Sequence, residues 1–86
     1  MKNYKNEILD KICYTELVYG RINKKLKIQF SKLEIEKMLL DILTITKEEY
    51  FQKIGKNIYI TNTEKNIKIT VNSNTNRIIT VDKIIF

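Results

Sequence analysis

The stretch GKNIYITNTEKNIKITVNSNTNRIITVDKIIF (Gly55–Phe86) decides the fold, because its apolar residues recur at every second position. Alternation of apolar and polar residues is typical of strands with one buried face. The alternating runs are separated by short segments rich in Asn and Ser, and connections this short join neighbouring strands in antiparallel order. We therefore predict a three-stranded antiparallel β-meander over residues 57–85, with Ile79 and Val81 as the inward pair of its last strand.

Before Gly55 the spacing of the apolar residues is helical. Ser31 and Glu34 have the spacing of a capping box, in which each side chain bonds to the backbone N–H of the other residue. Ile35 begins an apolar stripe that continues along one helix face to Leu43. This pattern predicts a helix that begins just after Ser31.

The same spacing recurs at Thr46 and Glu49. It predicts a second capping box and a short helix that runs through Lys53. Gly55 is well placed to end this helix, because glycine readily adopts the left-handed conformation that follows many helix C-termini.

Two earlier helices are predicted from the spacing of their apolar residues, one over residues 3–13 and one from Thr15 to about Lys27. Thr15 is a suitable N-cap for the second helix, since its hydroxyl can accept from a free backbone N–H. Gly20 lies inside this second helix and costs up to about 1 kcal/mol relative to alanine. It therefore indicates a close approach of another segment or a local break.

A chain of 86 residues is long enough for one hydrophobic core. We expect one α+β domain over residues 1–86, with three to four helices in a helical part (3–54) followed by the β-meander (57–85). No apolar run approaches the length of a membrane span, and the charged N-terminus lacks the apolar stretch of a signal peptide. We expect a cytoplasmic protein that does not contact membranes.

The composition excludes several classes of site. The chain has no histidine, and Cys13 is its only cysteine. An intramolecular disulfide, a cysteine-built zinc site and any dyad that uses histidine are therefore excluded. We assign no catalytic residue, no metal ligand and no cofactor.

The formal net charge is +6, and the basic residues are unevenly distributed. Between Glu16 and Glu34 there is no acidic residue, and this interval contains Arg21, Lys24, Lys25, Lys27 and Lys32. A cluster of this kind predicts a surface that faces phosphates. The alternative interpretation is an ordinary solvated helix face in a lysine-rich protein.

The polar face of the predicted meander adds an aromatic ring and further cations. A base can stack on such a ring while the cations bind the backbone of a single strand. The candidate residues for binding RNA, a ribonucleoprotein or another partner are Tyr19, Arg21, Lys24, Lys25, Lys27, Tyr59, Lys68 and Arg77.

Two stretches carry a resemblance to a known family: ICYTELVYGRINKKL (Ile12–Leu26) and NIKITVNSNTNRIITVDKI (Asn66–Ile84). They resemble a family of short bacterial proteins catalogued as a domain of unknown function numbered 3781. The resemblance implies no activity, cofactor or partner. It implies that six residues match positions of the family's motifs, namely Thr15, Glu16, Tyr19, Arg21, Asn72 and Thr80.

Two alternative functions remain open at this point. Helices followed by a meander also resemble small ribonuclease toxins of the RelE and barnase–colicin type, some of which cleave RNA with Lys, Arg and Tyr in place of His. The chain departs from that pattern because it lacks their early strand. The other alternative is a protein-interaction or self-associating module, for example an inhibitor encoded by a mobile element, with its anchor or dimer contact at Ile84, Ile85 and Phe86.

Overall fold

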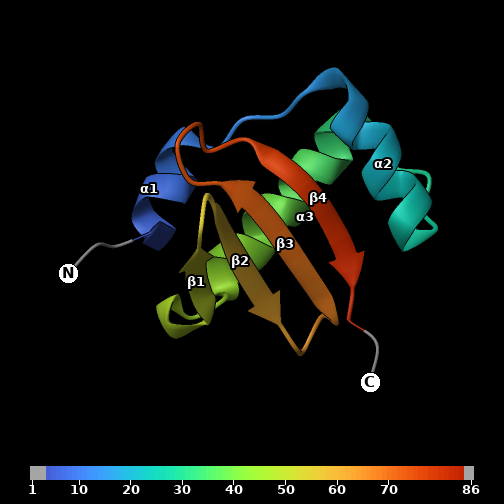
Figure 1. Cartoon of the computed structure of the whole chain (residues 1–86). Helices are drawn as coiled ribbons and strands as arrows, with labels where there is room; N and C mark the ends of the chain where they lie inside the picture. Colours follow the sequence, from blue (N-terminus) through green and yellow to red (C-terminus); the bar gives the residue numbers. More distant parts are fainter. Residues whose placement is uncertain (1–3, 85–86) are drawn as a thin grey trace.

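A computed structural model of the chain describes residues 4–84, and these form an α+β fold (Figure 1). The helices precede the strands, as the sequence predicts. The elements in chain order are α1 (Tyr4–Lys11), α2 (Glu16–Leu26), α3 (Lys32–Ile45), the 3-10 turn η1 (Glu48–Tyr50), β1 (Phe51–Ile54), β2 (Asn57–Asn62), β3 (Ile67–Asn72) and β4 (Ile78–Lys83).

The sheet within residues 4–84 has four antiparallel strands in the order β1-β2-β3-β4. The three-stranded prediction was therefore one strand short. The additional strand, β1, occupies part of the segment for which we predicted a helix through Lys53. Only η1 is helical there, and β1 pairs with β2 through a two-residue turn. Gly55 has the predicted left-handed conformation, with φ of 63°, but it lies in this turn and does not end a helix.

Two contacts explain why the second capping box does not form. The hydroxyl of Thr46 donates to the carbonyl of Ile42 at 2.6 Å, so it continues the hydrogen bonding of α3 and does not start a new helix. Phe51 is buried in the core when it pairs with Ile60 in the sheet. Burial of a phenylalanine ring contributes about 2–3 kcal/mol, which outweighs the gain from one short exposed helical turn.

The helices cover one face of the sheet. Figure 1 shows α3 crossing this face, with α2 beside the edge strand β4. The core contains one side of each helix and the inward residues of the strands. Its fully buried members are Ile8, Ile22, Ile35, Leu39, Leu43, Ile60, Ile69, Val71, Ile78 and Val81.

Strand β4 contains an irregularity that changes which residues face the core. Thr70 pairs with Thr80, whereas the next residue, Val71, pairs with Ile78, so Ile79 has no partner across the ladder. Such a bulge shifts the alternation by one residue. The inward pair is Ile78 and Val81, and the prediction of Ile79 as an inward residue was wrong.

The capping box at the start of α3 is confirmed. Ser31 Oγ accepts from the Glu34 backbone N–H at 3.2 Å, and Glu34 Oε1 accepts from the Ser31 N–H at 2.9 Å. These hydrogen bonds from Ser31 hold the pKa of Glu34 below its usual value.

Helix α2 differs from the prediction in two details. It is unbroken at Gly20, and, apart from the adjacent residues and the backbone of its own helix, no heavy atom lies within 4 Å of where a Cβ would stand on that residue. The predicted break or close approach was therefore wrong. Thr15 is the N-cap, but its side chain makes no capping hydrogen bond.

Candidate functional site

Two cationic side chains of α2 contact the edge strand β4, one by a hydrogen bond and one by an ion pair. Arg21 Nη1 donates to the carbonyl of Ile79 at 3.2 Å, and Lys25 Nζ lies 2.7 Å from Asp82 Oδ1. Arg21 and Lys25 are four residues apart and so share one side of the helix. Ile79 is the residue that the bulge leaves without a strand partner. Its carbonyl is therefore satisfied by Arg21.

Asp82 places these helix cations next to the polar face of the sheet. In the β-ladder Asp82 pairs with Lys68, which in turn pairs with Thr61. Lys68 Nζ lies 5.7 Å from the centroid of the Tyr59 ring, a cation–π distance. A shallow hollow of about 380 Å³ lies beside this row, lined by Thr61, Lys68, Asp82, Lys83 and Ile84.

We call this region the basic surface and define it by the residues Arg21, Lys24, Lys25, Lys68, Tyr59 and Asp82. Lys24 belongs to it because it is exposed on α2 between Arg21 and Lys25. The basic surface combines four cations, one carboxylate and one half-buried aromatic ring. It joins most of the residues that the sequence singled out for binding.

Tyr19 does not belong to the basic surface, because it faces α3. Its hydroxyl donates to Glu36 Oε2 at 3.0 Å, its ring stacks on Tyr14 with centroids 5.6 Å apart, and Lys32 Nζ lies 5.4 Å from its centroid. Burial and the hydrogen bond to Glu36 raise the pKa of Tyr19. Tyr19 therefore holds α2 against α3, and both its ring and its hydroxyl have partners within the protein.

Tyr14 is the member of this contact that sequence reasoning missed. Burial, together with the nearby charge of Glu36, raises its pKa to about 12. It precedes α2 and has no helical or strand periodicity around it, so no pattern in the sequence indicates its partner.

The other two candidate residues are Lys27 and Arg77, whose backbones make contacts elsewhere in the fold. Lys27 ends α2 in the left-handed conformation, with φ of 56°, and its N–H bonds to the carbonyl of Asn23. Arg77 lies just before β4, where its backbone forms an isolated β-bridge with Cys13 and its carbonyl accepts from the N–H of Asn72. Arg77 and Asp82 are five positions apart, which corresponds to about 16 Å along a strand.

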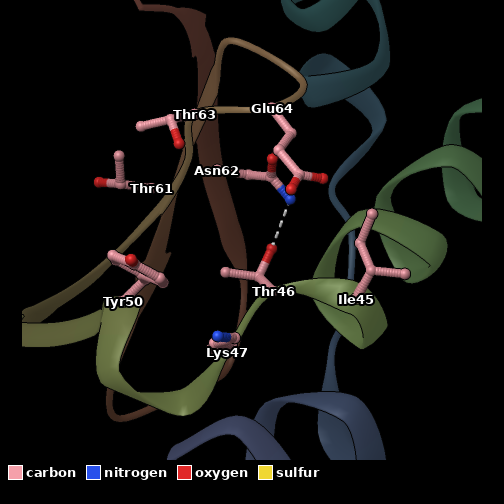
Figure 2. A pocket seen from close by; sticks show the side chains of 8 residues that line it. All are labelled: Ile45, Thr46, Lys47, Tyr50, Thr61, Asn62, Thr63 and Glu64. Atoms are coloured by element: carbon pink, nitrogen blue, oxygen red, sulfur yellow. Dashed lines mark hydrogen bonds between the residues drawn. The ribbon is translucent and has the colours of Figure 1, made fainter.

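A second polar site lies where α3 ends (Figure 2). Thr46 and Asn62 are 3% and 7% exposed, and Asn62 Nδ2 donates to Thr46 Oγ1 at 2.9 Å. The hollow next to them has a volume of about 160 Å³ and includes Lys47, Tyr50 and Glu64 in its lining.

The polar atoms of this second site serve the C-terminus of α3. Asn62 Oδ1 accepts from the Lys65 N–H at 2.9 Å, so the amide binds both the end of α3 and the turn after β2. Lys5 Nζ, from α1, donates to the carbonyls of Thr44 and Thr46 at 2.7 and 2.8 Å. A cation there donates to the terminal carbonyls and interacts favourably with the partial negative charge at the C-terminus of the helix. The site is thus explained as a helix cap.

Residues 4–84 contain no group of three or more Cys, Asp or Glu side chains that could hold a metal ion. None of the helices in that range is both long and apolar enough to cross a membrane. Of the predicted apolar anchor, Ile84 is half-buried. Ile85 and Phe86 lie outside the described residues.

Comparison with known proteins gives a family match. A family model described as "Protein of unknown function (DUF3781)" matches residues 6–82. No curated protein and no solved structure matches the chain.

Proposed function

Since the chain belongs to the family described as Protein of unknown function (DUF3781), which carries no assigned role, we propose a function from its surface: it is a small binding protein that contacts single-stranded RNA, free or within a ribonucleoprotein, through the basic surface. The match covers all of Ile12–Leu26 and all but the last two residues of Asn66–Ile84, the two stretches that carry the resemblance.

The observation that carries the proposal is the ion pair between Lys25 and Asp82 at 2.7 Å. Through Asp82 the cations of α2 adjoin Lys68 on the sheet. Cations from two elements thus line one surface along which a phosphate backbone can run. Lysine and arginine that meet phosphates release condensed counterions, and this release favours binding.

The sheet face favours a single strand over a duplex. Proteins that bind single strands combine a cationic track with an aromatic ring on which a base stacks. Tyr59 supplies a half-buried ring beside Lys68. In the free protein the ammonium of Lys68 covers this ring, so an incoming base takes the place of the ammonium, which is then free to meet a phosphate.

The experiment compares two charge-reversal variants that change the net charge equally. Lys24→Glu with Lys68→Glu alters the basic surface. Both lysines are exposed, and neither forms an ion pair with an acidic side chain among residues 4–84. Lys37→Glu with Lys47→Glu is the control, on α3 and just after it. Binding of a fluorescein-labelled twelve-nucleotide RNA is measured by anisotropy at low salt.

We expect the basic-surface variant to bind the RNA at least about tenfold more weakly than the control variant. A matched RNA duplex should bind more weakly than the single strand. If the native chain does not bind RNA at low salt, or if both variants lose the same affinity, the proposed function is wrong.

A further inference from the structure

An apolar groove lies at the end of the molecule where the α2–α3 loop meets the β2–β3 turn and the end of β4. It has a volume of about 460 Å³. The residues that line it are mostly apolar, namely Leu26, Ile28, Phe30, Met38, Ile67 and Ile84, together with Lys65, Asn66 and Lys83.

Hydrogen bonds hold the walls of the groove in place. The side chain of Asn23 makes two 3.0 Å bonds to the backbone of Phe30, one to its N–H and one to its carbonyl. On the other wall the N–H of Ile84 donates to the carbonyl of Asn66 at 2.9 Å. A groove that is already formed in the free protein binds at lower entropic cost than one that must be ordered.

The charges at the groove indicate the kind of partner. Both charged residues of the lining are lysines, and both are exposed. Neither Lys65 nor Lys83 forms an ion pair with an acid in the described range, 4–84. The groove therefore offers an apolar floor with unpaired cations at its rim.

From this complementarity we propose that the groove binds an acidic amphipathic segment of a partner protein. A bulky apolar side chain of the partner enters between Phe30, Met38 and Ile67, and flanking Asp or Glu residues meet Lys65 and Lys83. Nucleic acid fits this groove less well, because within residues 4–84 Phe30 is the one aromatic residue of the lining and the other apolar residues are aliphatic. In recognition of this kind the buried apolar contact contributes most of the affinity, and the charged residues contribute the specificity.

This inference does not depend on the proposed RNA function, since it uses other residues. The test begins with a display library of random twelve-residue peptides, selected on the full chain after nuclease treatment. We expect enriched peptides to carry a bulky apolar residue flanked by Asp or Glu. Enrichment of neutral or basic peptides, or no enrichment, would overturn the proposal.

The best peptide is then labelled and its affinity measured for three variants. Lys65→Glu with Lys83→Glu should weaken binding at least about tenfold, and Phe30→Ser should weaken it as well, while circular dichroism shows that both remain folded. Lys24→Glu with Lys68→Glu, which changes the charge equally on the basic surface, should leave it unchanged. If the two charge variants lost the same peptide affinity, Lys65 and Lys83 would have no specific role in binding.

Two further outcomes would assign the groove to another occupant and so refute the proposal. Tighter peptide binding by Phe86→Ser would show that the chain's own C-terminal residues compete for the groove. A dimer in analytical sedimentation that Phe30→Ser abolishes would show that a second copy occupies it. A monomer whose peptide affinity is unchanged by Phe86→Ser supports the acidic partner.

Discussion

The cap at the end of α3 yields a prediction whose size follows from the structure. Thr46→Val preserves the shape of a side chain that is 3% exposed and removes its hydroxyl. The change removes the 2.6 Å bond to the Ile42 carbonyl. It also removes the acceptor of the Asn62 amide, which is then left with a buried N–H and no partner.

These two losses have known magnitudes. A typical intramolecular hydrogen bond contributes about 1 kcal/mol net, and a buried donor left without a partner costs about 1–3 kcal/mol. We expect Thr46→Val to lower the free energy of unfolding by about 2–4 kcal/mol. Urea unfolding followed by far-ultraviolet circular dichroism measures this, and the transition midpoint should fall with no change in the slope m.

Thr44→Val is the matched control for this prediction. Thr44 makes the same type of bond, from Oγ1 to the carbonyl of Leu40 at 2.7 Å, but its side chain is exposed and has no Asn62 contact. It should cost less than about 0.5 kcal/mol. Equal effects of the two substitutions would refute the reasoning, as would a Thr46→Val and Asn62→Leu double-mutant cycle that is additive within about 0.5 kcal/mol.

Three other predictions follow from single residues. Gly20→Ala should raise the free energy of unfolding by up to about 1 kcal/mol, because α2 is unbroken there and a Cβ meets no neighbour within 4 Å; lower stability in urea would contradict this. Ultraviolet titration should detect a tyrosinate that forms only at about pH 12 and is absent in Tyr14→Phe. Since the pKa of Tyr14 is raised in the folded chain from 10.0, its contribution to stability is present below pH 10 and is lost as pH rises towards 12. Asp82→Asn removes the carboxylate that neutralises Lys25, so RNA affinity should rise about threefold, and a fall would count against the basic surface.

The segment from Thr46 to Ile54 shows what local sequence signals can and cannot predict. The Ser31 and Glu34 spacing predicts its helix correctly, because both hydrogen bonds of a capping box lie within four residues. The same spacing at Thr46 fails for one local reason and two distant ones. The Thr46 hydroxyl donates to the carbonyl of Ile42, four residues earlier. From further along the chain, the amide of Asn62 donates to the same hydroxyl, and Phe51 pairs with Ile60 in the sheet.

The sheet shows the same division between local and distant effects. Alternation correctly predicts β2, β3 and β4 as an antiparallel meander, because the side-chain period of a strand is local. The bulge at Ile79 follows from the register between β3 and β4, and the carbonyl it leaves is bonded by Arg21 of α2. A run of apolar residues contains no signal for that contact.

The sequence indicates candidate residues for the site but not how the fold groups them. The absence of acids between Glu16 and Glu34 identifies the cations of α2, and alternation places Lys68 and Tyr59 on the polar sheet face. The link between them depends on Asp82, which is 57 residues from its partner Lys25. The position of Tyr19 depends in the same way on a residue distant in sequence, because its hydroxyl donates to Glu36 of another helix.

The proposed function requires RNA to bind electrostatically across α2 and β3 together. This claim is tested by the slope of log K against log salt concentration for the single-stranded RNA. Each phosphate contact contributes about −0.7 to this slope, so the Lys24→Glu and Lys68→Glu variant should have a slope smaller in magnitude by about 1–2 than the native chain. An unchanged slope in this variant would contradict the claim.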